Sequence, residues 1–554
     1  MTLPTADGDT RTAVGLPVQL RTEPPVTEAS GAPNSRLARA ALLTALLSAA
    51  GAILGLGRDQ SLAHLFGAGS ETDAFLVAWT VPEFAATLLI EDGLAFVLVP
   101  AFSAAVARRA QAGGTDPVRT LVSSSLPRFG LAFLAAAALL IAGAPFLVHV
   151  LAPGLPDPRL AVDCTRLTAT CALTFGLTGY CSAALRAHGC YLPPAAIYVA
   201  YNIGIIATML VCGTRFGVRS AAMGVAVGGC LMVAIQLPAF NRRLTSAKAA
   251  EKLAGEAGDE VAAKGRAMHL GLIAAVLTFA LCKQSQVFIE RFLASSLAAG
   301  SISHLNYAQK VSQLPMVLSL MLCTVTFPVV AQAVARGDIA AARARVERDL
   351  GLAASVVLLG AAAIFACAPQ IIHVLFQRGA FTADDTAATA SVMRVYALGL
   401  LGHSMVGALV RSYFSAGRPT WYPVGAMAVG MGATAGVGSW AVGLWGVRGI
   451  AGANAFGITL TAVLLLAAMD RRGVPVDVSR VLAEMGKPLL AATGATVAGL
   501  MAAASFTSPP AAGAAGCLAV TAVFVLLLWA LRAESLVPLV PVVRSATRRL
   551  RHAR

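Results

Sequence analysis

Charged side chains occur inside long apolar stretches of this chain, where placing a charge is unfavourable in free energy. An unpaired charge at the centre of a bilayer costs at least about 2.5–3.5 kcal/mol on insertion scales. The residues of this kind that we select as candidates for substrate binding or transport are Arg58, Asp59, Asp73, Glu91, Lys283, Glu290, Arg291 and Lys310. Arginine binds phosphate through two parallel hydrogen bonds, and lysine acts as a point charge. The set predicts an enclosed polar cavity whose cations meet an anionic headgroup such as a diphosphate.

Each charge also has a purely structural interpretation. Arg58 and Asp59 are adjacent and would pair at the membrane edge, and Glu290 and Arg291 would pair near the outer surface. Charged side chains near helix ends often reach the interface and have no further role. The histidines His304 and His403 are interpreted as polar groups in helix packing. The clustering of charges in a few segments favours the cavity over these separate explanations.

The segments that must position these charges are membrane helices. The chain is 57% hydrophobic and only 12% charged, and a bilayer core of roughly 30 Å needs about 20 apolar residues per helix. We predict an all-α integral membrane protein with about fourteen transmembrane helices. Their expected ranges are 37–57, 74–104, 127–152, 161–185, 192–213, 220–239, 268–297, 302–334, 350–374, 386–412, 421–445, 449–469, 485–505 and 512–531.

A charged loop divides these segments into six and eight. We expect two pseudo-symmetric lobes facing a central cavity, plus two C-terminal helices. Proline in the second and eighth segments suggests broken helices in matching positions, which is typical of transporters with a midplane site. Gly57, Pro82 and Pro315 are the candidate hinges. The predicted units are a disordered cytoplasmic tail (1–35), an N-lobe (36–239), a cytoplasmic linker (240–267), a C-lobe (268–470), the last two helices (471–535) and a basic cytoplasmic tail (536–554).

The net charge of +15 is explained by the topology of a membrane protein rather than by nucleic-acid binding. Arginine and lysine gather in alternate loops, which indicates that those loops and both termini are cytoplasmic. The basic side chains that support this include Arg108, Arg109, Arg242, Arg243, Arg343, Arg348, Arg471, Arg472, Arg548 and Arg549. The ten cysteines are scattered without a CxxC pair and are interpreted as small buried apolar residues. We expect no metal, no cofactor and no enzymatic activity, because no nucleotide-binding or hydrolase motif is present.

Several runs resemble the MurJ (MviN) lipid II flippases of the multidrug/oligosaccharidyl-lipid/polysaccharide exporter superfamily. They are LGLGRD at 54–59, LFGAG at 65–69, TDAFLVA at 72–78, LASSL at 293–297 and LFQRGAFT at 375–382. The similarity spans roughly 37–535. It implies a bacterial cytoplasmic-membrane protein that moves an undecaprenyl-diphosphate-linked precursor by alternating access for peptidoglycan synthesis. Membrane lipids and cell-wall synthesis proteins are the further implied partners.

The resemblance also assigns roles to residues. Arg58 and Asp73 match family positions important for flipping, and Lys310 stands where the family usually has arginine. A groove reaching 485–505 and 512–531 would hold the lipid tail. The chain departs from the family where its arginine pair is replaced by Ala86 and Thr87, and where another arginine is Ala52. Three alternatives therefore stay open: a paralogous exporter of another lipid-linked cargo, a multidrug-type antiporter using Asp73, Glu91 or Glu290, and a non-transporting cell-wall scaffold.

Overall fold

The computed structural model describes residues 35–91, 93–109, 116–245, 270–415, 420–472 and 476–533. The predicted basic tail (536–554), nearly all of the predicted N-terminal tail (1–35) and most of the predicted linker (240–267) lie outside these residues, as does Asp92. The domain boundaries placed there stay predictions.

The first half of the described chain is a group of helices that begins at Ser35 and ends at Thr245. Its elements are α1 (Ser35–Phe66), α2 (Ser70–Ala78), α3 (Thr80–Ala86), the π-helix η1 (Thr87–Glu91), α4 (Gly93–Arg109), α5 (Pro117–Ala142), α6 (Ala144–Leu151), α7 (Pro158–Ala169), α8 (Cys171–Ala187), α9 (Leu192–Phe216) and α10 (Arg219–Thr245). We call this set the N-terminal group.

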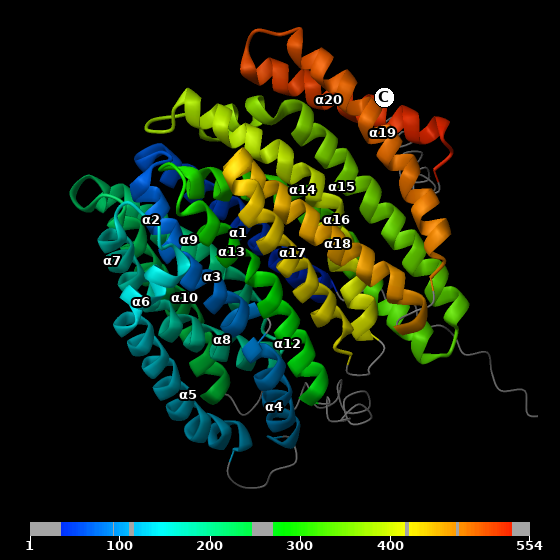
Figure 1. Cartoon of the computed structure of the whole chain (residues 1–554). Coiled ribbons are helices and arrows are strands. Elements are labelled where there is room, and N and C mark those ends of the chain that lie inside the picture. The colour runs from blue at the N-terminus through cyan, green and yellow to red at the C-terminus, as the bar shows by residue number, and fades with distance from the viewer. Residues whose placement is uncertain are drawn as a thin grey trace, which may run out of the picture.

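The second half is also helical throughout its described elements. They are α12 (Leu270–Gln284), α13 (Gln286–Ala294), α14 (Ser301–Ala335), α15 (Ile339–Phe376), α16 (Ala383–Ser415), α17 (Tyr422–Trp445), α18 (Val447–Arg472), α19 (Val478–Ala504) and α20 (Pro509–Ala530). We call α12 to α18 the C-terminal group. The last two helices, α19 and α20, pack on each other and on α15, at the edge of the molecule (Figure 1).

Eleven helices in the described part are long and apolar enough to cross a membrane. The structure is therefore that of a multi-pass membrane protein, as predicted. The three other predicted segments, 161–185, 268–297 and 302–334, are mainly helical in their described residues without being among the eleven, so the count of fourteen spans stays a prediction. Large apolar side chains such as Phe146, Val211 and Trp529 are exposed on the outside, where lipid would cover them.

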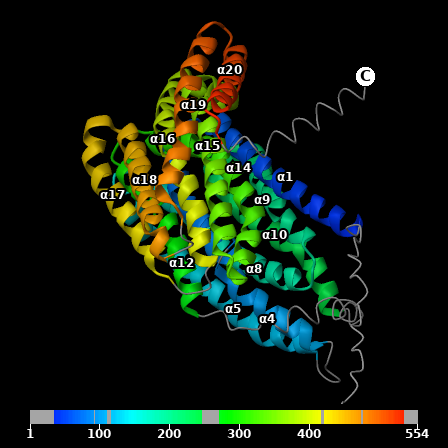
Figure 2. The ribbon, with the colours of Figure 1, turned by 90° about the vertical axis from the view of Figure 1, so that its right-hand side faces the viewer.

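Packing within each group is far more extensive than packing between them. In the N-terminal group α9 packs on α1 and α10, and in the C-terminal group α18 packs on α16 and α17. The view from the side likewise separates α16, α17 and α18 from α4 and α5 (Figure 2). The main contacts between the groups join α2 to α14, α6 to α13 and α1 to α15.

Helix breaks occur in the second, third, fourth and seventh predicted segments, the third at Gly143 and the fourth at Thr170. The second is interrupted at Trp79 between α2 and α3, and the seventh at Ser285 between α12 and α13. The predicted break in the eighth segment is wrong, because α14 continues through Pro315 as one helix. A proline bends a helix without necessarily ending it. Here the Pro315 ring packs against Gly360 of α15, where an added Cβ would lie 2.3 Å from the proline Cβ.

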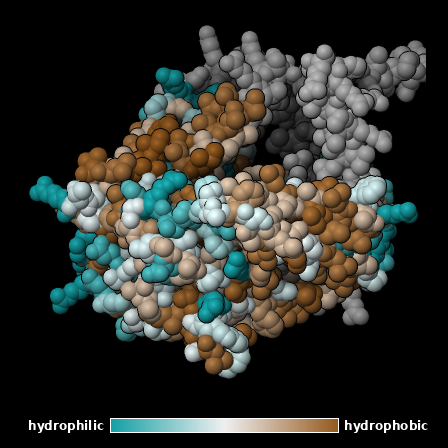
Figure 3. All heavy atoms as spheres, turned by 90° about the horizontal axis from the view of Figure 1, so that it is seen from above, coloured by the Kyte–Doolittle hydropathy of each residue, from teal (hydrophilic) through white to brown (hydrophobic). Residues whose placement is uncertain are grey.

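Backbone contacts join the two groups at one end of the molecule, where α1 ends and α2 begins. The backbone N–H of Ala380, in the loop after α15, donates to the carbonyl of His64 at 2.9 Å. Gly67, with φ of +68°, brings the chain so close that an added Cβ would lie 2.6 Å from the Ala380 carbonyl oxygen. Seen from this end, hydrophilic residues lie beside large apolar areas (Figure 3). The predicted topology places this end outside the cell.

Candidate functional site

Three charged side chains from both helix groups meet in an ion cluster, which we call the Glu83 cluster. Glu83 on α3 accepts from Arg291 Nη2 on α13 and from Lys310 Nζ on α14, each at 3.0 Å. The side chains of Arg291, Glu83 and Lys310 are 5%, 14% and 30% exposed. Arg291 also donates to the Thr80 hydroxyl on α3. The N-terminal group thus supplies the anion, and the C-terminal group supplies two cations.

The helix breaks help to bring these residues together. The second and seventh segments each have a break, and the short helices that follow the two breaks, α3 and α13, contact each other. Their aromatic side chains also meet, since Phe84 stacks on Phe288 with ring centroids 4.3 Å apart and an angle of 6° between the rings. Stacked rings of this kind add to the attraction between the two helices. The α3–α13 contact is therefore both apolar and ionic.

Arg58 of α1 lies beside the cluster within the N-terminal group. Its Nη2 donates to Asp59 Oδ1 at 2.7 Å, and its Nη1 donates to Asn202 Oδ1 of α9 at 3.4 Å. The guanidinium carbon lies 4.2 Å from the centroid of the Trp79 ring. Arg58, Arg291 and Lys310 all act electrostatically on Glu83. The structure therefore confirms the pairing of Arg58 with Asp59 and places Arg58 close to the Glu83 cluster.

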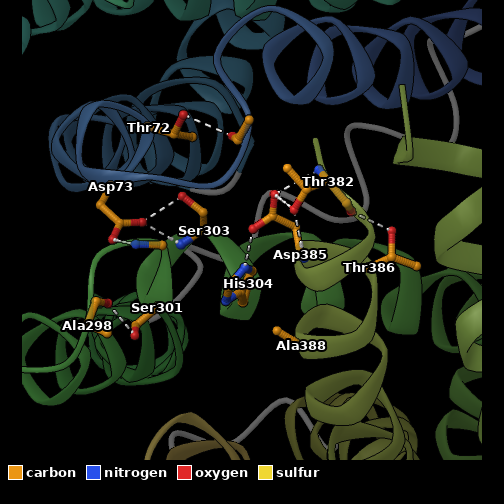
Figure 4. A network of polar contacts seen from close by, with 12 residues as sticks. Thr72, Asp73, Ala298, Ser301, Ser303, His304, Thr382, Asp385, Thr386 and Ala388 are labelled. Carbon is orange, nitrogen blue, oxygen red and sulfur yellow. Dashed lines mark hydrogen bonds and ion pairs between the residues drawn. The ribbon is translucent and has the colours of Figure 1, made fainter. Parts of the chain in front are cut away.

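Asp73 joins α2 to the start of α14 (Figure 4). Its carboxylate accepts from the backbone N–H of Gly300 at 2.7 Å, and from the backbone N–H and the hydroxyl of Ser303 at 2.7 and 2.6 Å. A carboxylate at this position satisfies amides at the N-terminus of α14 and opposes the positive end of its dipole. Beside it, His304 contacts Asp385 of α16 at 3.2 Å. Asp73 is therefore part of the joint between the groups.

Two further candidates, Glu290 and Glu91, form their hydrogen bonds outside the Glu83 cluster, although Glu290 is the sequence neighbour of Arg291. Glu290 is buried and accepts from the Asn454 amide of α18, which in turn contacts His403 Nε2 at 3.1 Å. Glu290 and Arg291 thus face different partners, so the predicted pairing of these neighbours is wrong. Glu91 accepts from the Tyr198 hydroxyl at 2.8 Å within the N-terminal group.

Lys283 and the hinge candidates complete the predicted set. Lys283 lies half-buried in the last turn of α12. Gly57 stands inside the continuous helix α1, and its carbonyl accepts from the Ser61 hydroxyl at 2.8 Å. Pro82 stands in the first turn of α3, directly after the break at Trp79. A proline fits there because the first turn of a helix has N–H groups without intrahelical partners.

Glu83 is the central residue that the sequence-based choice of candidates missed. The sequence does mark Glu83 as unusual, because it is a carboxylate inside an apolar segment directly after Pro82. Its partners were not predictable from spacing, since Arg291 and Lys310 are 208 and 227 positions away along the chain. Asn202, Ser303 and Asn454 were also missed. Uncharged polar residues are common in membrane helices, so their presence alone does not mark a site.

A sequence model described as "Lipid II flippase MurJ" matches residues 62–521 of this chain. Among similar proteins, the lipid II flippase MurJ of Burkholderia cenocepacia is 26% identical over 450 residues, which cover 78% of this chain and 84% of that protein. The probable lipid II flippase MurJ of Bdellovibrio bacteriovorus is 26% identical over 486 residues, covering 85% of this chain and 89% of its own length.

Solved structures agree with the fold. A lipid II flippase MurJ in an inward closed conformation superposes with a TM-score of 0.71 at 19% identity, covering 88% of this chain and 98% of its own. An inward-facing transporter of the multidrug resistance MATE family, from the MOP superfamily, superposes with a TM-score of 0.59 at 15% identity, covering 80% of this chain and 99% of its own. The predicted two-lobed exporter fold is confirmed by these likenesses.

Proposed function

The chain belongs to the lipid II flippase MurJ family, and we propose that it moves the headgroup of a prenyl-diphosphate-linked cell-wall precursor across the bacterial cytoplasmic membrane. The observation that carries the proposal is the Glu83 cluster, with Arg58 beside it. These ions lie between two helix groups of a membrane protein, where a charge is costly unless it is paired or used. Lipid II is the cargo that the family membership favours.

In the proposed cycle the headgroup enters from the cytoplasmic end, while the prenyl tail stays in lipid beside α15, α19 and α20. Arg58 of the N-terminal group and Lys310 of the C-terminal group both contact its phosphates. Their positive charges repel, and a bound diphosphate offsets that repulsion, so binding favours closure of the cytoplasmic end. This assigns the phosphate contacts to two residues that belong to different helix groups.

Opening toward the outside requires the joint at the other end to separate. Three hydrogen bonds from Gly300 and Ser303 to Asp73 close that end in this structure. We propose that they break when the headgroup is released. The cell-negative membrane potential then favours return of the empty, positively charged cavity to the inward state. Both termini are on the cytoplasmic side in this scheme.

An antiporter of small cations or drugs is the second candidate. The buried contact of Glu290 with Asn454 and the adjacent His403 favours it, because a carboxylate held away from the Glu83 cluster is a candidate for proton or cation coupling. Such a protein would show cation-dependent efflux that does not depend on prenyl precursors. Asp73 is a poorer candidate, since its carboxylate already accepts three hydrogen bonds at the start of α14.

Complementation tests the proposal in cells. The resident lipid II flippase of a bacterial host would be depleted while this chain is expressed, and lipid II exposed on the outer leaflet would be measured. We expect restored exposure and growth from the wild type and neither from Arg58→Ala at equal membrane abundance. No exposure from an abundant, correctly inserted wild type would contradict lipid II as the cargo, and full activity of Arg58→Ala would contradict the phosphate-binding role.

A further inference from the structure

A cavity of about 440 Å³ lies within the N-terminal group, between α1, η1, the end of α8 and the start of α9, and its mostly apolar lining carries several polar side chains. Its polar lining includes Ser48, Glu91, Arg186, Tyr191, Tyr198 and Asn202. The residues of the Glu83 cluster do not line it. Because α8 ends and α9 begins here, the predicted topology places the cavity at the cytoplasmic end of the molecule.

Arg186 is the cation that lines this cavity. It stands half-buried in the last turn of α8, and within the described residues its guanidinium has no hydrogen bond or ion pair. The carboxylate in the same lining, Glu91, already accepts from the Tyr198 hydroxyl. A guanidinium has five N–H donors in a planar fork that matches a phosphate group. Arg186 therefore has its donors available to an anion that enters the cavity.

Asn202 connects the cavity to Arg58. Its Nδ2 donates to the carbonyls of Gly51 and Tyr198 at 3.2 and 2.8 Å, which fixes the amide between α1 and α9. Its Oδ1 then accepts from Arg58 Nη1 at 3.4 Å. One face of the lining is thus continuous with the residue that we expect to bind phosphate deeper in the molecule. Ala52, where the family has arginine, lines the same cavity.

We propose that this cavity is a capture site for a sugar joined to a phosphate or diphosphate, which Arg186 binds before the headgroup reaches Arg58. Arg186 holds the phosphate, and Glu91 and Tyr198 supply hydrogen-bonding groups to the sugar hydroxyls. Arg186 thus supplies a cation to the same cavity that Ala52 lines, at a position where the family has arginine. This inference rests on the proposed function, because that function supplies the lipid-linked form of the ligand.

Binding to the full chain in nanodiscs tests the proposal. The two probes are undecaprenyl-diphosphate-N-acetylglucosamine, mixed into the nanodisc lipid, and the soluble compound uridine-diphosphate-N-acetylglucosamine. We compare the wild type with Arg186→Gln and with Arg215→Gln, a matched control in the last turn of α9 at the opposite end. We expect Arg186→Gln to weaken binding of the lipid probe about tenfold or more, a free-energy change of about 1.4 kcal/mol, and Arg215→Gln to leave it unchanged.

Each other outcome has a distinct meaning. Equal binding of the lipid probe by Arg186→Gln and the wild type overturns the capture site and leaves the flippase proposal standing. Arg186-dependent binding of the soluble probe alone overturns the lipid-linked cargo, and binding of neither probe overturns both proposals. If Arg186→Gln does not fold, Tyr198→Phe replaces it, because it removes only the hydroxyl that contacts Glu91, and unchanged affinity in that variant counts against the site.

Discussion

At the residue scale, the charges inside this membrane protein are tolerated because they neutralise one another. Glu83 contacts both Arg291 and Lys310, and Arg58 is paired with Asp59. A buried ion pair contributes little net stability relative to apolar packing, but removal of one partner is strongly destabilising. We therefore propose that the Glu83 cluster serves to hold and release charge between the two helix groups.

Replacing Glu83 with Gln should leave Arg291 and Lys310 facing each other without an anion. We expect a loss of about 2 kcal/mol in the free energy of unfolding, less than for a fully buried pair because Lys310 keeps some water. The measurement is a reversible sodium dodecyl sulfate titration of the purified chain. The double variant Glu83→Gln/Lys310→Met should recover part of the loss, because it removes one of the two repelling cations.

Glu91→Gln is the matched control for that experiment. It makes the same chemical change in the same predicted segment, but Glu91 contacts the neutral Tyr198 hydroxyl rather than two cations. Its effect on stability should be clearly smaller. Equal losses in Glu83→Gln and Glu91→Gln would mean that the ion cluster has no special energetic role.

At the element scale, the start of α14 depends on a side chain from another helix. The carboxylate of Asp73 on α2 satisfies the N–H groups of Gly300 and Ser303, a task that a residue of the same chain segment usually performs. The ordering of α14 is thereby coupled to closure of this end of the molecule. When the joint opens, those N–H groups need water or another acceptor.

Asp73→Asn should loosen this joint without unfolding the helices. An amide is a weaker acceptor than a carboxylate, and it gains an N–H that cannot pair with another donor. We expect hydrogen exchange at residues 300–303 to accelerate about fivefold, in line with the roughly 1 kcal/mol that a helix cap contributes. Asp157→Asn is the control, since Asp157 caps α7 within its own group. Unchanged exchange at 300–303 in Asp73→Asn would contradict the proposed joint.

The helices could be predicted from sequence, but their breaks and partners could not. Apolar runs at 192–213 and 421–445 correspond to α9 and α17 because membrane span length follows from bilayer thickness. The prolines were a poor guide, because Pro315 packs on Gly360 inside a continuous helix while the break at Ser285 has no proline. Arg58 and Lys310 were predicted as candidates, but contacts such as Glu83 with Arg291 depend on how two helix groups face each other.

At the scale of the whole molecule, the two ends differ. Hydrogen bonds from Ala380 to His64, from Ser303 to Asp73 and from the backbone N–H of Gly154 to the Ser295 hydroxyl tie the helix groups together at the end predicted to be outside. The cavity beside Arg186 lies at the end predicted to face the cytoplasm. Between them lie Arg58 and the Glu83 cluster, which we propose as the charged middle of the transport path. This order suits a headgroup that enters from the cytoplasm, meets the cluster and leaves when the outer joints open.

Flipping by the purified protein tests this account most directly. The full chain would be reconstituted into vesicles that carry fluorescent lipid II, with a membrane potential imposed, and the fraction of lipid II accessible to a membrane-impermeant quencher would be followed in time. We predict exchange of lipid II between leaflets that is faster than in protein-free vesicles and is lost in Arg58→Ala. Exchange at the protein-free rate by folded wild-type protein, across either sign of the potential, would contradict the central claim.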